Sequence, residues 1–339
     1  MSRHYVEFRT HYEDDFLKCS PAIFGCGQEE CSNFCLGDTY GSLYYIGKEN
    51  DKPIYYFRHS NPNSFRFGGF VELGDDYLMP QKGGYHHSDI AQIDAKIKGY
   101  RKISSCPLTY GFESEEPFSE YRFYDDHATF KEGDFFEVNA TPLPITIVDH
   151  GCIFPPMNQV SQPCLLEGTY EGKKVIGLGS YDRYFMPKSI KTDFAENLGY
   201  ICASGIGQRD DGRYEVMIAT INDNGTKCGI YWLEGNDPIY ANDVKFAADW
   251  VHLPYVSDGT CIYQKAVISF AGIEIHITGK WGTKGFTKEP RIERHGQSQV
   301  FGTWYTGNSL YRHKLSNSFF ENMNCFDYRL IDKGYRVIE

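Results

Sequence analysis

Residues 162–185 read QPCLLEGTYEGKKVIGLGSYDRYF and predict two strands joined by a tight turn, called here the central hairpin. The second strand ends in an ionisable pair, Asp182-Arg183, which Tyr181 and Tyr184 flank. An ionisable pair that leaves an apolar hairpin into aromatic surroundings suits acid–base chemistry on an oily substrate. The central hairpin therefore predicts both a β fold and a candidate site.

The composition favours β structure in a chain of two domains. At 339 residues the chain exceeds one ordinary domain, and 41% hydrophobic with 23% charged residues is typical of a globular protein. Aromatic residues make up 16%, with 26 Tyr and 24 Phe. Such side chains favour pleated, half-buried surfaces, and they also suit the wall of an apolar cavity. Packing between strands and binding of a ligand both remain open as their role.

Turns and alternating residues predict strands along most of the chain. Residues 42–47 and 53–58 flank a Lys-Glu-Asn-Asp turn, and residues 213–221 and 228–233 flank an Asn-Gly turn. In residues 273–280, isoleucines alternate with polar residues, which predicts a strand with one buried face. Many strands with short turns predict an all-β chain of antiparallel sandwich or barrel type.

A break in the pattern near residue 190 predicts two consecutive β domains. Their expected bounds are 1–188 and 189–339. Few helices are expected. One is predicted over 88–100, where isoleucines recur at helical spacing, and a closing helix is predicted over 311–323.

The acidic balance argues against a nucleic-acid partner. The formal charge is −11 at pH 7, whereas phosphates need a surface of Lys and Arg. No stretch approaches the ~20 apolar residues of a membrane span. The first residues, MSRHYVEFRTHYEDDF, are polar and mixed in charge, unlike a signal peptide. We therefore expect a cytoplasmic protein with reduced thiols.

Four of the 11 cysteines lie close together near the N-terminus, at Cys19, Cys26, Cys31 and Cys35. Their spacing lacks the C-x2-C step of common zinc sites. Unpaired thiols are the favoured interpretation, and a structural metal is the alternative.

The sequence lacks the patterns of nucleotide cofactors and of a common hydrolase class. Gly177-Leu-Gly179 and Gly205-Ile-Gly207 have neither the third glycine nor the following helix of a dinucleotide fingerprint. A G-x-S-x-G nucleophile elbow does not occur. We expect neither a cofactor nor a metal.

The central hairpin also resembles a known family. Its pattern Q-P-x-L-x-x-x-G-T-x-x-G-K-x-V-x-G-x-G-x-x-D is similar to the end of the first domain in hydroxyneurosporene synthase-like proteins, which include the carotenoid hydratases. The matching residues are Pro163, Leu165, Gly168, Gly172, Val175, Gly177 and Asp182. The resemblance implies two lipocalin-like domains, an architecture related to that of fungal Diels–Alder cyclases.

The family segment closes in Asp-His and an aromatic residue, where this chain has Asp182-Arg183-Tyr184. A guanidinium stays protonated, so Arg183 cannot shuttle protons as a histidine does. Arg183 could instead hold Asp182 ionised, or bind a carboxylate or carbonyl of a substrate. The change affects hydration by the family route more than binding or cyclisation.

The expected catalytic residues are Asp182 as acid or base, with Arg183 and His150 polarising the substrate. For His150, which precedes the central hairpin, a structural role at a strand end is the alternative. The expected substrate-binding residues are aromatic or share a strand face with an aromatic residue. They are Tyr181, Tyr184, Trp250, His252, Trp281, Trp304 and Tyr305. For the tryptophans, filling the core is the alternative.

Two functions from different classes fit these residues. The first is a cofactor-independent enzyme, a hydratase or dehydratase, an isomerase or a cyclase. It would act on a hydrophobic polyene, terpenoid or polyketide-like molecule in an aromatic cavity between the domains. The second is a lipocalin-like carrier for a small hydrophobic molecule, with Asp182-Arg183 as a structural ion pair. We favour the enzyme.

Overall fold

A computed structural model shows the chain as β-strands joined by turns. The structure describes residues 4–8, 32–47, 53–61, 65–72, 100–105, 108–112, 119–124, 126–150, 158–187, 200–222, 225–252, 261–285, 297–307 and 313–323. Every regular element within these ranges is a strand, which confirms the predicted all-β class. Within the same ranges no helix is long and apolar enough to cross a membrane.

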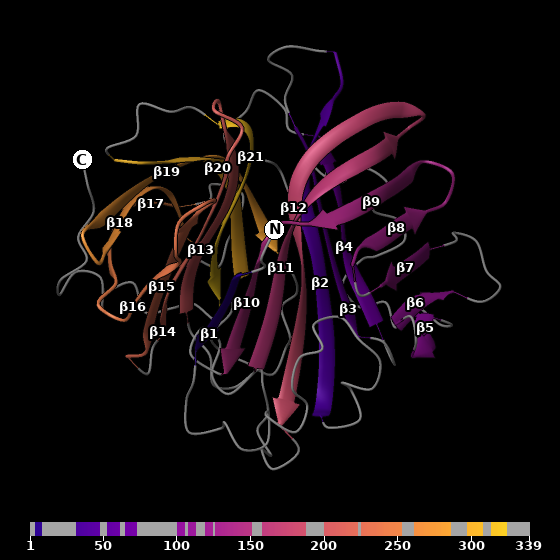
Figure 1. Cartoon of the computed structure of the whole chain (residues 1–339), viewed down its shortest axis with the longest axis horizontal. Coiled ribbons are helices and arrows are strands. Elements are labelled where there is room, and N and C mark those ends of the chain that lie inside the picture. The colour runs from indigo at the N-terminus through magenta and orange to yellow at the C-terminus, as the bar shows by residue number, and fades with distance from the viewer. Residues whose placement is uncertain are drawn as a thin grey trace. The chain divides into compact units, whose positions relative to one another are not determined.

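The chain divides into two compact units, each built on one sheet (Figure 1). The 12 strands of the first unit are β1 (His4–Phe8), β2 (Ser32–Tyr45), β3 (Ile54–Asn61), β4 (Phe65–Glu72), β5 (Tyr100–Ser105), β6 (Leu108–Phe112), β7 (Ser119–Phe123), β8 (Ala128–Glu132), β9 (Phe136–Pro142), β10 (Ile145–His150), β11 (Asn158–Tyr170) and β12 (Lys173–Pro187). The nine strands of the second unit are β13 (Tyr200–Arg209), β14 (Tyr214–Asn222), β15 (Lys227–Leu233), β16 (Ile239–Ala241), β17 (Lys245–His252), β18 (Cys261–Phe270), β19 (Ile273–Gly285), β20 (Gln297–Thr306) and β21 (His313–Met323).

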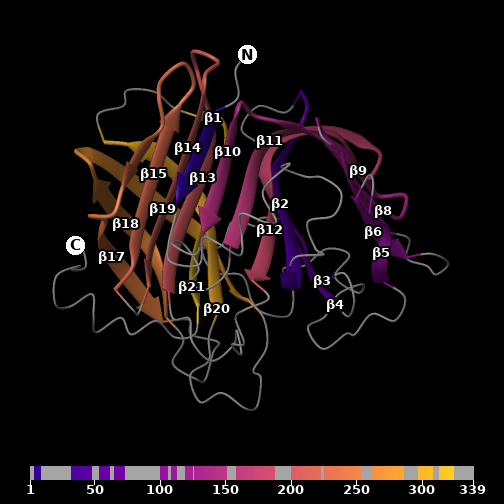
Figure 2. The same ribbon diagram turned by 60° about the horizontal axis from the view of Figure 1, so that its bottom comes forward.

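The sheet of the first unit is a curled sheet with the central hairpin near its middle. Its strand order is β4-β3-β2-β12-β11-β9-β8-β7-β6-β5, and β10 pairs with β11 and with β1. The pair of β1 and β10 is parallel, whereas the other pairs are antiparallel. Figure 2 shows the sheet as an arch, with β3 and β4 on one limb and β5 and β8 on the other.

Side chains from distant strands meet inside this arch. Arg58 of β3 donates from Nε and Nη2 to the two carboxylate oxygens of Glu132 in β8, at 2.8 and 2.7 Å. Tyr121 also donates its hydroxyl to Glu132. The rings of Tyr56 and Phe136 lie 5.3 Å apart. Because β2, β12, β11 and β9 separate β3 from β8, these contacts require the sheet to curl over its own inner face.

The sheet of the second unit curls in the same way. Its order is β16-β15-β14-β13-β21-β20-β19-β18-β17. Gly229 of β15 leaves space that the ring of Phe270 in β18 fills, since a Cβ on this glycine would lie 2.7 Å from the ring. The inner face carries a core of buried apolar residues that includes Met217, Ile275, Ile277 and Trp304. Curled, mainly antiparallel sheets agree with the predicted lipocalin-like fold class.

The glycines of the central hairpin allow it to turn tightly and to press against its neighbours. Glu171 and Gly172 have φ of 48° and 72°, as a two-residue hairpin turn of the right twist requires. A Cβ on Gly168 would lie 2.0 Å from the backbone oxygen of Glu137, and a Cβ on Gly177 would lie 2.0 Å from that of Ser42. The glycine spacing of the sequence motif therefore reflects close approach of β11 and β12 to the adjoining strands.

We expect Gly177→Ala to destabilise the protein by about 3 kcal/mol, because overpacking against a backbone atom cannot be relieved by a side-chain rotation. Gly172→Ala is the matched control in the same hairpin. The added Cβ meets open space in this variant, so the only cost is the strain of a positive φ, about 1 kcal/mol. Urea unfolding of both variants measures the difference. Equal losses in the two variants would contradict the proposed close approach.

The closing helix predicted over 311–323 is wrong, because residues 313–323 form β21, which pairs with β13 and β20. Leu315, Ser316, Asn317 and Ser318 are all buried there. Ser and Asn are weak helix formers, and pairing with two strands outweighs the local preference. Of the other predicted helix, 88–100, the structure describes only Tyr100, the first residue of β5.

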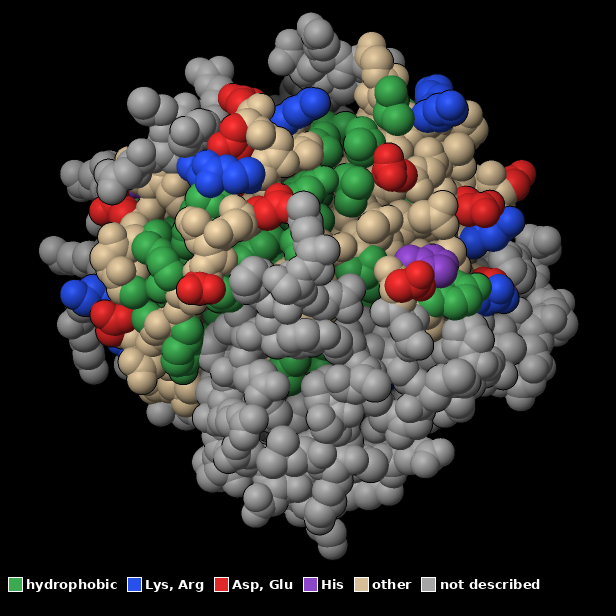
Figure 3. All heavy atoms as spheres, in the orientation of Figure 1, with side chains coloured by type: hydrophobic (Ala, Val, Ile, Leu, Met, Phe, Trp, Pro, Cys, Tyr) green, Lys and Arg blue, Asp and Glu red, His purple; other side chains and the backbone are tan. Residues whose placement is uncertain are grey.

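Charged side chains of both signs are scattered over the described part of the face in Figure 3, with hydrophobic side chains between them. A Lys/Arg stripe of the kind that binds a phosphate backbone does not run across that part of the face. The large hydrophobic side chains exposed among the described residues are Ile46, Ile239, Tyr240 and Tyr305.

Candidate functional site

Asp182 lies in β12, between β11 and β2. In the register of the sheet it stands opposite Ser161 of β11 on one side and Asp38 of β2 on the other. Residues directly opposite each other share one face of a sheet, at close Cβ distances. The structure therefore gathers two carboxyl groups and a hydroxyl on one face, from three strands.

Hydrogen-bond donors surround the Asp182 carboxyl group. Ser180 donates its hydroxyl to Oδ1 at 2.5 Å, and Gln159 donates from Nε2 to Oδ2 at 3.1 Å. The same Gln159 amide nitrogen lies 2.6 Å from Ser161 Oγ. Only 4% of Asp182 is exposed. The carboxyl group is thus held in place by side chains while it is shielded from water.

Burial raises the pKa of Asp182 from 3.8 to about 8, and the negative charge of Asp38 acts in the same direction. The hydrogen bonds from Ser180, Ser161 and Gln159 act in the opposite direction, because they favour the carboxylate. The effect of burial on the pKa is larger than the effect of these hydrogen bonds. Asp182 therefore holds its proton at neutral pH, and the same donors can stabilise the carboxylate once that proton has left.

Arg183 points away from this cluster. Successive residues of a strand face opposite sides of the sheet, so Asp182 and Arg183 do not lie side by side, as an ion pair between them would require. Arg183 is fully buried, and its guanidinium carbon lies 5.8 Å from the centre of the Phe123 ring. Tyr181 shares this face, with its ring 5.6 Å from Phe123 and 6.0 Å from Phe130. The structure brings Tyr181 and Arg183 together inside the arch and separates both from Asp182.

His150 is the last residue of β10 and pairs with Asn158, and its side chain lies outside the described part of the structure. The preceding Asp149 is fully buried and stands opposite Gln159, on the face that carries Asp182. In the Asp149-His150 dipeptide the aspartate is thus the member that the structure places with Asp182.

Sequence reasoning missed most of the groups around Asp182, namely Asp38, Asp149, Gln159, Ser161 and Ser180. A signal for four of the residues involved was present, because Gln159-x-Ser161 and Ser180-x-Asp182 each place two polar side chains on one strand face. The pairing with Asp38 depends on a strand more than a hundred positions away in the chain and had no local signal.

Trp304 and Tyr305 of β20 belong to the second unit. Trp304 is 2% exposed, and its ring lies 4.6 Å from that of His313. Tyr305 is 46% exposed and stacks on His276 at 5.0 Å. Because Trp304 and Tyr305 are neighbours on a strand, their side chains face opposite sides of the sheet and cannot both line one binding cavity.

The remaining expected binding residues are described in their backbone alone. Tyr184 of β12 pairs with Gln159, and Trp250 and His252 lie at the end of β17. Trp281 lies in β19, next to a shift in its register with β20. Their binding roles stay predictions.

Among the described residues, no group of three or more His, Cys, Asp or Glu side chains is arranged to hold a metal ion. Cys19, Cys26 and Cys31 lie outside the described residues, and Cys35 lies in β2, where its side chain is not described. The described cysteines, which are Cys164, Cys202 and Cys228, are all buried.

The structure defines the class of this protein as an all-β chain with two curled sheets. No protein-family model and no curated protein matches its sequence. Among solved structures, it is similar to a protein assigned as AttH from Nitrosomonas europaea, at 12% identity and a TM-score of 0.48, over 90% of this chain and 96% of the other. Kievitone hydratase from Nectria haematococca is similar at 8% identity and a TM-score of 0.47, over 96% and 99% of the two chains. CghA in a crystal structure with Sch210972 is similar at 9% identity and a TM-score of 0.42, over 86% and 88%.

Proposed function

We propose that this protein is a cofactor-independent enzyme of the hydratase or dehydratase, isomerase or cyclase type, with Asp182 as its proton donor. The observation that supports this most strongly is the buried Asp182 carboxyl group, whose pKa of about 8 keeps it protonated at neutral pH. A proton donor works best when its pKa lies near the working pH. The resemblance of the central hairpin to the family of carotenoid hydratases supports the same class.

The chemistry follows from a carboxylic acid next to a carbon–carbon double bond. The O–H bond of Asp182 breaks, a C–H bond forms, and the substrate becomes a carbocation while Asp182 becomes a carboxylate. Ser180 and Gln159 already donate to this group and would stabilise the negative charge as it forms. Addition of water to the cation gives hydration, loss of a different proton gives isomerisation, and attack by a second double bond gives cyclisation. Asp182 regains a proton in each case.

The substrate class is a hydrophobic polyene, terpenoid or polyketide-like molecule, because the reaction needs an electron-rich double bond. We assign the binding roles inferred from the sequence to Tyr184, Trp250, His252 and Trp281, as the lining of an aromatic cavity. Such a site would fold the substrate into a reactive conformer, which lowers the barrier further. A cytoplasmic location belongs to the same proposal.

Isotope incorporation tests this function even while the product is unidentified. Extraction and mass spectrometry first identify any molecule that co-purifies with the protein. That molecule, together with lycopene, geraniol and 2,4,6-octatrienal as probes, is then incubated with the protein in D2O and in water labelled with oxygen-18. We expect deuterium in a product or in recovered substrate, accompanied by oxygen-18 if the reaction is hydration. Binding of a probe with neither isotope nor any rearranged product would instead indicate a carrier.

A further inference from the structure

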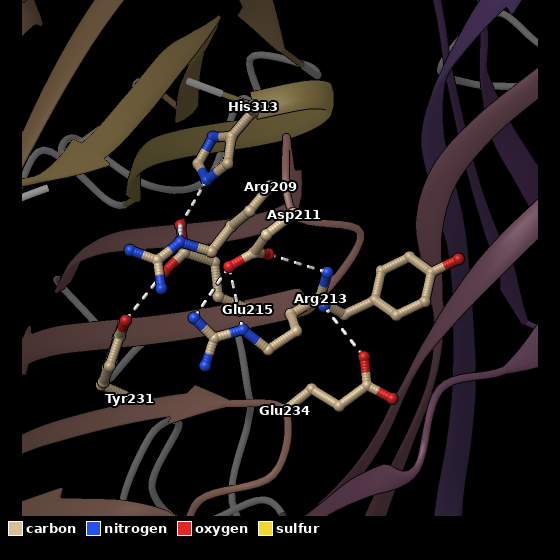
Figure 4. A network of polar contacts seen from close by, with 8 residues as sticks. Arg209, Asp211, Arg213, Glu215, Tyr231, Glu234 and His313 are labelled. Atoms are coloured by element: carbon tan, nitrogen blue, oxygen red, sulfur yellow. Dashed lines mark hydrogen bonds and ion pairs between the residues drawn. The ribbon is translucent and has the colours of Figure 1, made fainter. Parts of the chain in front are cut away.

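The second unit contains an ionisable cluster that the Asp182 chemistry does not use (Figure 4). Its centre is Glu215 of β14, with Tyr231 of β15 beside it and His313 of β21 on the other side. Gly207 of β13 stands opposite Glu215. A Cβ on Gly207 would lie 2.4 Å from His313 Nε2, so the glycine provides the space in which the imidazole ring reaches Glu215.

The contacts within this cluster fix the orientation of the imidazole. His313 Nε2 lies 2.5 Å from Glu215 Oε1, and the Tyr231 hydroxyl donates to Oε2 at 2.8 Å. Glu215 is 1% exposed, and the His313 side chain is 5% exposed. Arg209 Nε lies 3.9 Å from Glu215 Oε1 and balances the buried negative charge. The carboxylate is therefore a rigid acceptor for the histidine.

The second ring nitrogen of His313 is left for another group. A carboxylate only accepts hydrogen bonds, so Nε2 carries the hydrogen and, in the neutral ring, Nδ1 presents a lone pair. Figure 4 shows the other ring nitrogen directed away from Glu215. Among the described residues Nδ1 has no hydrogen-bond partner. An imidazole oriented by a carboxylate, with its second nitrogen open, is the arrangement of a general base.

Trp304 packs against the His313 ring and carries an unused donor. Its ring lies 4.6 Å from the His313 ring and is packed among apolar residues that include Ile275 and Ile277. The indole is 2% exposed, yet its Nε1–H has no hydrogen-bond partner in the described part of the chain. A buried indole N–H normally finds a partner. The two rings that carry this acceptor and this donor thus pack against each other, and neither group has a partner among the residues that the structure describes.

We propose that His313, Glu215 and Trp304 form a second ligand site, in which His313 Nδ1 takes the proton of a phenol or enol. The O–H bond of the ligand breaks as an N–H bond forms, which leaves an imidazolium and a phenolate or enolate. Glu215 stabilises the imidazolium, and the Trp304 N–H can donate to the new oxyanion. Phenols and enols are favoured over aliphatic alcohols because their acidity lies much closer to that of imidazolium. The residues of this site all belong to the second unit, and the proposal does not depend on the role of Asp182.

Two matched ligands test the site on the unaltered protein. 2-Naphthol offers an O–H group, whereas 2-methoxynaphthalene has nearly the same apolar surface without one. We expect 2-naphthol to bind about tenfold more tightly, the effect of one hydrogen bond to a buried partner. Nitrogen-15 NMR of labelled histidine is expected to show the Nδ1 resonance of His313 shift with 2-naphthol alone. Equal affinity for the two ligands, or no binding of 2-naphthol, would overturn the proposal.

Variants locate the binding within the chain. His313→Phe keeps a ring against Trp304 but removes the nitrogen, and it is expected to abolish the tenfold preference for 2-naphthol. The chain offers a matched control in His276, which contacts Glu274 at 2.7 Å on an exposed part of β19. His276→Phe should keep the preference, and so should Asp182→Asn, which separates this site from the proposed enzyme function. Loss of the preference for 2-naphthol in His276→Phe, or its persistence in His313→Phe, would show that the O–H group binds to another part of the protein.

Discussion

Asp182→Asn is expected to lower turnover of the identified substrate by a factor of ~10²–10⁴ while its binding affinity stays within a few fold. Asn keeps the shape of the side chain and can still accept hydrogen bonds, but it has no acidic proton to transfer to a double bond. Steady-state kinetics and equilibrium binding on the same preparation measure the two effects. Asp134→Asn, at an exposed turn position, is the control and should behave as the unaltered protein.

The pH dependence of kcat/KM provides a second test of Asp182 as the proton donor. If Asp182 acts as an acid, kcat/KM should be constant below its pKa of about 8 and fall about tenfold per pH unit above it. Unchanged turnover in Asp182→Asn would remove the role of Asp182 as proton donor. Loss of turnover together with loss of binding would assign this residue to ligand recognition instead.

Asp182→Asn is also expected to remove a pH dependence of stability. The pKa of Asp182 is about 8 in the folded chain, against 3.8 in the unfolded chain. Between these values the unfolded chain releases a proton that the folded chain keeps, so the free energy of unfolding falls as the pH rises from about 4 to about 8. At about 1.4 kcal/mol for each pKa unit, the difference between 3.8 and about 8 amounts to about 6 kcal/mol, of which about 5 kcal/mol is lost between pH 4 and pH 8. Below pH 4 and above pH 8 the contribution is constant.

The Asn side chain does not ionise, so this variant should gain stability relative to the unaltered protein as the pH rises. Urea unfolding at intervals between pH 4 and pH 9 measures the difference between the two proteins. It should grow by up to about 5 kcal/mol across this range, whereas Asp134→Asn should parallel the unaltered protein throughout. Parallel curves for Asp182→Asn would mean that the carboxyl group is solvated in the folded chain.

The expected partnership between Asp182 and Arg183 changed most when the structure was known. Adjacency in sequence suggested that Arg183 holds Asp182 ionised, which would lower the pKa of the carboxyl group. The alternation of side chains along β12 places the two on opposite faces, and burial raises the pKa instead. The guanidinium contributes to the inner face of the arch, next to Phe123. Asp182 therefore holds its proton at neutral pH and is not a fixed negative charge.

Local patterns predicted the strands where turn chemistry and alternation were strong. The hairpin of β2 and β3 and the hairpin of β14 and β15 lie where the sequence predicts them. The helix predicted over 311–323 was wrong because residues 313–323 pair on one side with β13 and on the other with β20. β13 is remote in sequence, so the local pattern carries no sign of this pairing. Propensity is a weak signal where neighbours of this kind decide the pairing.

By itself the sequence determined the β class, a tight turn within residues 162–185 and the position of Asp182 on the second strand of the central hairpin, since these depend on residues close together in the chain. Only the tertiary structure decided what surrounds the reactive groups. Asp38 reaches Asp182 through the pairing of β2 with β12, and His313 reaches Glu215 across 98 positions. Such contacts, and the burial that sets a pKa, arise when remote strands pair. The spacing of residues along a single strand therefore cannot predict these contacts or this burial.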